Sequence, residues 1–203
     1  MSSARFVVVE GGDAGGKSTQ IALLVARLRA VDLDVVATFE PGATPAGAIV
    51  RELLLHSKES VSPAAEALLM AADRAQHVAE IVRPALDAGQ WVVSDRFVPS
   101  SLVYQGVVRG LGVDAIDAMN RLAVSAATPD VVLVLDVADD VVAARRGAPT
   151  DRLEAEGASF HAEVREAYRV LARARGWVVI DGDAAVDVVA ERVWHAVEPL
   201  LAG

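Results

Sequence analysis

The chain has 203 residues, of which 53% are hydrophobic, and it contains no cysteine. This length suits one α/β domain, 1–203, with a full core, and the lack of cysteine excludes disulfides, thiolate metal sites and cysteine nucleophiles. Its apolar runs are too short to span a bilayer, and a strand begins too soon after Met1 to leave room for a signal peptide, so we expect a soluble, cytoplasmic protein. The net charge of −9 disfavours a nucleic-acid polymer as partner but allows a small anion held by clustered arginines.

Short β-branched runs alternate along the chain with longer segments of helical periodicity. A helix is expected from Lys17 towards Arg29, and Ser62-Pro63 is typical of the start of another that runs to about Ile81, with Pro84 ending or kinking it. This alternation predicts an α/β three-layer sandwich, a parallel sheet of about five strands with helices on both faces. The expected strands are Phe6–Val9, Val35–Phe39, Trp91–Ser94, Val131–Leu135 and Trp177–Ile180, and the last helices are Asp139–Arg146, Ala155–Arg175 and Ala184–Leu201.

The first predicted strand leads into a glycine-rich loop that matches the phosphate-binding pattern G-x-x-x-x-G-K-[ST], with Ser18 as its last residue. Glycines let successive backbone N–H groups point into one concavity, and the helix that follows adds its positive N-terminal end. Lys17 can then neutralise the outer phosphates, and the Ser18 hydroxyl can bind Mg²⁺. A plain turn is the alternative, and the strand, lysine and helix together disfavour it. We expect ATP to contact Gly11, Gly12, Asp13, Ala14, Gly15, Gly16, Lys17, Ser18 and Thr19.

A second charged motif, Asp95-Arg96, directly follows the strand predicted to end at Ser94. Ligands of open parallel sheets bind at the carboxyl ends of the strands, where this pair and the glycine-rich loop both fall. Asp95 can hold Mg²⁺, usually through water, and the planar guanidinium of Arg96 can bridge donor and acceptor phosphates. Asp136 also ends an apolar strand, but it lacks such an arginine beside it and ranks below Asp95.

The run DRFVPSSLVYQ, which begins at Asp95, resembles the signature of thymidylate kinases, the P-loop enzymes that phosphorylate dTMP. Four further stretches are similar to this family in the same order: FEPGATPAG, LLMAADRAQHV, PDVVLVLDV and RRGAPTDRLE. The resemblance implies a P-loop NTPase fold with a small helical lid at about residues 145–158. It also implies ATP with Mg²⁺ as phosphoryl donor, dTMP as acceptor and a homodimer.

The same resemblance implies roles for single residues. Asp13 matches a carboxylate against the 3′-hydroxyl of the deoxyribose, Arg74 the arginine at the thymine edge, and Tyr104 the tyrosine below the sugar. Phe39 and Met70 depart from the family pattern, which usually has an arginine and an aromatic residue there. Arginines of the lid would close over the transferring phosphoryl group, and these are Arg145, Arg146 and Arg152. The other expected substrate contacts are Pro41, Arg51, Arg96 and Ser101.

Phosphoryl transfer needs positioning and neutralisation of charge more than covalent chemistry from the protein. Lys17, Asp95 and Arg96 with the lid arginines supply that set, so the sequence predicts ATP-dependent phosphorylation of dTMP to dTDP. Two alternatives stay open. Because Met70 is unusual at its position, the acceptor can be another nucleoside monophosphate. Alternatively, the chain can be a P-loop regulatory module that binds ATP without transferring phosphate.

Overall fold

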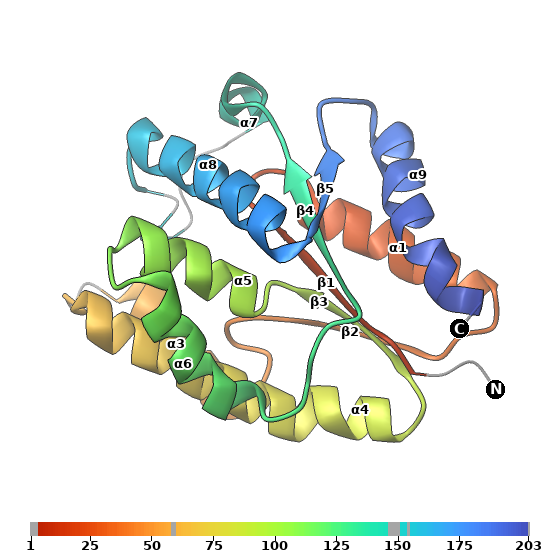
Figure 1. The fold of residues 1–203 in the computed structure, drawn as a ribbon, viewed down its shortest axis with the longest axis horizontal. Coiled ribbons are helices and arrows are strands. Elements are labelled where there is room, and N and C mark those ends of the chain that lie inside the picture. Colours follow the sequence, from red (N-terminus) through yellow and green to blue (C-terminus); the bar gives the residue numbers. More distant parts are fainter. Residues whose placement is uncertain (1–3, 58–59, 146–150, 154, 203) are drawn as a thin grey trace.

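The computed structural model describes residues 4–57, 60–145, 151–153 and 155–202. Its centre is a five-stranded, all-parallel sheet in the order β2-β3-β1-β4-β5 (Figure 1). Every predicted strand is confirmed to within two residues, because buried parallel strands are apolar on both faces and stand out as β-branched runs. The strands are β1 (Phe6–Gly11), β2 (Val35–Phe39), β3 (Trp91–Asp95), β4 (Val131–Asp136) and β5 (Val178–Asp181).

The central strand, β1, is buried along its whole length and pairs with β3 on one side and β4 on the other. The register places Val8 opposite both Ser94 and Val132, so the carboxyl ends of the three strands lie at one edge of the sheet. The glycine-rich loop follows β1, and Arg96 follows β3. Two motifs far apart in the sequence therefore meet at this edge.

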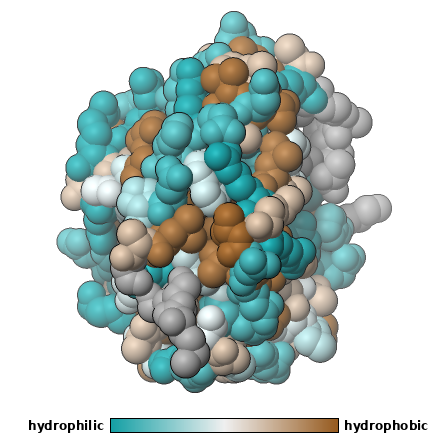
Figure 2. Space-filling model, turned by 90° about the vertical axis from the view of Figure 1, so that its right-hand side faces the viewer, coloured by the Kyte–Doolittle hydropathy of each residue, from teal (hydrophilic) through white to brown (hydrophobic). Residues whose placement is uncertain are grey.

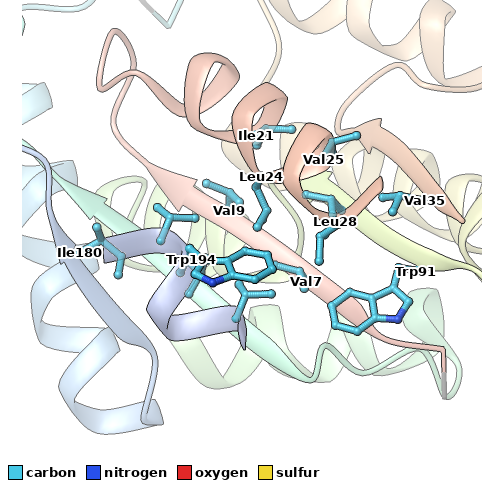
Figure 3. Packing of buried hydrophobic residues seen from close by; sticks show 14 of the residues in the cluster. Val7, Val9, Ile21, Leu24, Val25, Leu28, Val35, Trp91, Ile180 and Trp194 are labelled. Carbon is cyan, nitrogen blue, oxygen red and sulfur yellow. The ribbon is translucent and has the colours of Figure 1, made fainter. Parts of the chain in front are cut away.

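Helices cover both faces of the sheet. On one face, α1 (Lys17–Ala30) and α9 (Val186–Val197) pack through Leu24, Leu28 and Trp194 onto apolar strand residues such as Val7 (Figure 3). A short 3₁₀ helix, η4 (Glu198–Ala202), follows α9. The other face carries α3 (Pro63–His77), η2 (Val78–Val82), α4 (Arg83–Asp87), α5 (Val98–Ser101), η3 (Leu102–Val108), α6 (Val113–Val124) and α8 (Ala158–Arg175). The connections also include α2 (Pro45–Arg51), η1 (Glu52–His56) and α7 (Asp139–Arg145).

The sequence predicted that the helix beginning at Pro63 would run to about Ile81 and that Pro84 would end or kink it. The helical path does not end there and instead continues past Pro84. Its path continues through a π-helical stretch, η2, into α4, which ends at Asp87. In this stretch the N–H of Arg83 donates to the carbonyl of Val78, five residues back. The proline, which has no N–H to offer, is the second residue of α4, a position where a helix tolerates it.

Both ends of the described chain lie at the amino ends of the strands, opposite the edge where the motifs meet (Figure 1). The Arg5 guanidinium contacts the Leu200 carbonyl oxygen at 3.5 Å there. The side of the molecule seen in Figure 2 has hydrophobic residues interspersed with hydrophilic ones. None of the helices in the described ranges is both long enough and apolar enough to cross a membrane.

Candidate active site

A cavity of about 690 Å³ opens at the carboxyl ends of β1, β2 and β3. Its walls are the glycine-rich loop, the turn after β2, helices α2 and α3 with η1, and the segment that runs from β3 into η3. The end of α7 and the segment 151–153 complete them. The predicted site residues on these walls are Asp13, Ala14, Gly15, Gly16, Lys17, Ser18, Thr19, Phe39, Pro41, Arg51, Met70, Arg74, Asp95, Arg96, Ser101, Tyr104 and Arg145. Residues predicted to bind the nucleotide and residues predicted to bind the acceptor therefore share one cavity.

The glycine-rich loop has a backbone that only particular residues can follow. Gly11 has φ +135°, and a Cβ built on it would lie 2.6 Å from the carbonyl oxygen of Leu135 in the neighbouring strand. Gly16 has φ +89° as the residue before α1, and Ala14 also has a positive φ. A side chain at Gly11 would push the loop away from β4, so this glycine fixes where the loop leaves the sheet.

Lys17 is buried at the base of the loop, where its Nζ donates to the carbonyl oxygens of Gly11 at 3.1 Å and Gly12 at 2.9 Å. Burial, together with the nearby Arg96 cation, lowers the pKa of the Lys17 ammonium, and Asp95 and Asp13 oppose the shift. The charged form is thus costly in the protein alone. Phosphate oxygens in this cavity would stabilise it, which is the property an anion-binding lysine needs.

Arg96 joins the loop to the segment after β3. Its Nη2 pairs with the Asp13 carboxylate, and its Nη1 lies 3.1 Å from Ser100 Oγ and 3.4 Å from the Tyr168 hydroxyl. The backbone of Arg96 has φ +71°, in the left-handed region that non-glycine residues seldom adopt. Although burial opposes ionisation of Asp13, Arg96 and Lys17 outweigh it and lower the pKa of this carboxyl. Tyr104 Oη contacts the second Asp13 oxygen at 3.4 Å.

Glu10, fully buried in β1, lies behind Arg96. One carboxylate oxygen accepts from the backbone N–H groups of Phe97 at 2.8 Å and Ser100 at 3.2 Å, and the other accepts from Ser100 Oγ at 2.6 Å and Tyr168 Oη at 2.8 Å. Burial raises the pKa of Glu10, while Arg96 and these donors act against the shift. Since Ser100 and Tyr168 also contact Arg96, the carboxylate orients the guanidinium through them.

Asp95 fits a role in holding a divalent cation. Its Oδ1 is buried and has no hydrogen-bond partner among the described residues, and it shares the cavity with the exposed hydroxyl of Ser18. Carboxylate and hydroxyl oxygens are the ligands that Mg²⁺ prefers. The rival, Asp136, is paired instead with Arg165 Nε at 2.6 Å and Arg169 Nε at 3.4 Å. No cluster of three or more acidic or histidine side chains suited to a metal occurs within the described ranges.

At the wall of the cavity formed by α3, Arg74 is buried and almost fully hydrogen-bonded. Its Nε donates to Glu40 Oε2 at 2.8 Å, and its Nη2 donates to the Phe97 carbonyl at 3.0 Å. Its Nη1 donates to Ser101 Oγ at 3.0 Å and to Asn120 Oδ1. Glu40 also accepts from His77 Nδ1 at 2.7 Å. The guanidinium is therefore fixed in one orientation at the wall of the cavity before any ligand binds.

The two positions that depart from the family pattern also line the cavity. Met70 lies on α3, one turn before Arg74, and is partly exposed. Phe39, 44% exposed at the end of β2, has the Arg51 guanidinium over its ring at 5.8 Å. Arg51 also donates to the carbonyl oxygen of Pro41 at 2.8 Å. Phe39 thus carries no positive charge at this wall of the cavity, but the neighbouring Arg51 of α2 does.

The predicted lid arginines lie in different places. Arg145, the last residue of α7, is exposed and lines the cavity. Arg146 lies outside the described residues. Arg152 Nη2 pairs with Glu66 at 2.5 Å, and its Nε donates to the carbonyl oxygen of Leu54 at 3.0 Å. Its side chain therefore extends toward η1 and α3.

Known proteins are similar to this chain along most of its length. The family model for thymidylate kinase matches residues 9–193 of the chain. The chain belongs to the thymidylate kinase family. It is 42% identical over 201 residues to a thymidylate kinase of Halothermothrix orenii, with 97% of each chain covered. It is 44% identical to one of Methylococcus capsulatus, covering 100% and 99%, and 44% identical to one of Leifsonia xyli, covering 93% and 91%.

The thymidylate kinase match confirms the resemblance drawn from the sequence motifs, and the structure adds residues that those motifs did not single out. Glu10 carried one signal, since it is a charged residue inside an otherwise apolar strand. Glu66 carried none beyond its place in the first turn of a helix. Leu55 also lines the cavity, as do Gln105, Asp151 and Leu153, which lie within the quoted motifs but were not predicted as site residues.

Proposed function

We propose that this chain transfers the γ-phosphoryl group of ATP to dTMP, giving ADP and dTDP. The observation that carries the proposal is that the phosphate-binding loop, Asp95 and Arg96 line the same cavity as Arg74 and Tyr104. An oxygen of the dTMP phosphate attacks the γ-phosphorus, and the bond from that phosphorus to the β,γ-bridging oxygen breaks. The bonding electrons leave with ADP.

The chain's own groups supply positive charge around the transferred phosphoryl group. Lys17 at the loop and Arg145 at the rim lie on the donor side, and Arg96 lies where the two phosphates meet. Such preorganised cations stabilise the charge that develops on the equatorial oxygens. Asp95 and Ser18 would hold Mg²⁺, which when bound neutralises charge on the β- and γ-phosphates.

The acceptor end is built to hold a base and a deoxyribose. Arg74, fixed by four partners, presents its edge to the base, while Met70 packs on the ring with an adaptable thioether. The Tyr104 phenol and the Asp13 carboxylate lie together at the sugar. Burial raises the pKa of Tyr104 far above neutrality, so it acts as a neutral phenol.

The test is product formation from ATP and Mg²⁺ with dTMP, dUMP, dCMP, UMP and dGMP in parallel, resolved by chromatography. Strong dTDP formation with little product from the other acceptors is expected. Lys17→Ala is expected to lower it by about 100- to 1000-fold, whereas Arg173→Gln, on an exposed face of α8, serves as a control with unchanged turnover. Preferential use of another acceptor would refute thymidylate as the substrate. ATP binding without any product would refute phosphoryl transfer itself.

We also propose a cytoplasmic location, because ATP and nucleoside monophosphates are present in the cytoplasm. A homodimer belongs to the same proposal. Three exposed apolar side chains support an interface on α2, α3 and α6: Ile49 is 73% exposed, Leu68 58% and Leu122 89%. A second copy of the chain would remove them from water. Sedimentation of Leu122→Asp is expected to show monomers where the wild type shows dimers; a monomeric wild type would refute the interface.

A further inference from the structure

The buried carboxylate of Glu66 connects three walls of the cavity. It lies in the first turn of α3 and is 1% exposed. Its Oε1 accepts from Gln105 Nε2 at 2.9 Å, and its Oε2 pairs with Arg152 at 2.5 Å. Gln105 belongs to η3 and lines the cavity beside Tyr104. One carboxylate therefore joins helix α3, which carries Met70, to η3 and to the segment 151–153.

The segment 151–153 is fixed by its backbone as well. The N–H of Arg152 donates to the carbonyl oxygen of Leu55 at 3.0 Å, and the Arg152 Nε donates to that of Leu54 at 3.0 Å. Its neighbours on either side, Asp151 and Leu153, both line the cavity. The Arg152 side chain thus anchors the segment, and the two neighbouring residues form part of the cavity wall.

A second contact holds the chain just beyond this segment. Arg109 Nη2 donates to Glu156 at 3.1 Å, and its Nε lies 3.6 Å from Glu66 Oε1. The Arg109 guanidinium also lies over the Phe160 ring at 5.3 Å. Two arginines, Arg109 and Arg152, thus converge on the buried carboxylate of Glu66 from different parts of the chain. This arrangement differs from an isolated ion pair on the protein surface.

We propose that Glu66 and Arg152 are positioning residues that hold Asp151 and Leu153 against the acceptor end of the cavity. Arg152 acts through its neighbours, in contrast to the phosphoryl contact that the family resemblance implies for it. The inference rests on the proposed function in one respect: the ligand whose binding it controls is dTMP. Loss of the pair releases a wall of the acceptor pocket and leaves the phosphate-binding loop untouched.

Steady-state kinetics of Glu66→Gln and Arg152→Gln test the proposal. Each variant is expected to raise KM for dTMP by about tenfold or more, the effect of one charge-assisted hydrogen bond, with kcat and the KM for ATP close to wild type. The double variant is expected to resemble either single variant, because the two residues act as one unit. Arg152→Lys, which keeps the charge but has one nitrogen for two acceptors, is expected to lie between. Arg173→Gln is the control.

Arg152→Gln leaves a buried carboxylate without its nearest cation, so the neutral double variant guards against simple misfolding. The opposite pattern would overturn the proposal: Arg152→Gln lowers kcat while Glu66→Gln has no effect, as a phosphate ligand requires. Hydrogen exchange of the Arg152 amide in the ligand-free protein gives a readout independent of dTMP. Faster exchange in Glu66→Gln supports the anchoring role even if the wild type proves not to use dTMP, and unchanged exchange refutes it.

Discussion

Gly47→Ala tests how closely α2 packs on α3. A Cβ at Gly47 would lie 2.2 Å from Asp73 Oδ1 and 3.0 Å from Thr44 Oγ1. The Asp73 oxygen cannot move freely, because it accepts the N–H of Gly42 at 2.9 Å, and Thr44 Oγ1 accepts the N–H of Gly47 itself. The added methyl must therefore displace the carboxylate or separate α2 from α3.

The size of the effect follows from these contacts. Overpacking a dense site costs about 1–3 kcal/mol, and loss of a hydrogen bond to a charged acceptor costs about 1.5–3 kcal/mol. Replacing glycine by alanine within a helix returns roughly 1 kcal/mol. The net loss in the free energy of unfolding is then about 2–4 kcal/mol. For a protein of this length, that lowers Tm by roughly 5–15 °C.

Thermal unfolding followed by calorimetry measures this change, and Gly157→Ala is the matched control. Gly157 has φ −69°, and a Cβ there meets no atom within 4 Å in the described structure. Because Gly157 is the N-cap of α8, where alanine is less favourable than glycine, its substitution is expected to lower Tm by less than about 4 °C. Because Asp73→Ala removes the clash, Gly47→Ala is expected to cost less in that background. A Tm within about 2 °C of wild type for Gly47→Ala alone would refute the reasoning.

Three further predictions concern the charged groups of the cavity. Lys17→Ala should lower kcat by about 100- to 1000-fold, the loss typical of one preorganised charge donor, without lowering Tm, since burial disfavours this cation; a kcat within about tenfold of wild type would contradict it. Arg96→Lys should lower kcat by at least about tenfold, because an ammonium cannot reach Asp13, Ser100 and Tyr168 together. Burial raises the pKa of the Glu10 carboxyl above its ordinary 4.5. The free energy of unfolding therefore falls as this carboxyl ionises, when the pH rises above 4.5. Glu10→Gln should therefore gain stability relative to wild type as the pH rises above 4.5 in urea titrations, and parallel pH curves would exclude this.

Much of the fold and the site could be predicted because their signals are local. The strands of a buried parallel sheet are apolar on both faces, and a phosphate-binding loop needs its glycines, lysine and hydroxyl at fixed spacing. Helix α6 was not expected from the sequence. It begins after Gly112, without a side-chain cap, so the usual start signal is missing.

The partners of the buried acids could not be predicted, because they depend on contacts between distant segments. Glu10 meets Tyr168 across 158 positions, and Glu66 meets Arg152 across 86. No local pattern encodes such pairs. The sequence identified the arginine of the DRLE motif, but its direction is set by the carbonyl of Leu54 and by Glu66, both of which come from earlier elements.

The contact between Arg5 and Leu200 has a practical consequence. Both ends of the described chain can be tied to a solid support, a fluorophore or a fusion partner at nearly the same point, as is common for compact domains. That point lies at the amino ends of the strands (Figure 1). The cavity opens at their carboxyl ends. A surface bearing the protein by either end would leave the mouth of the cavity facing the solution.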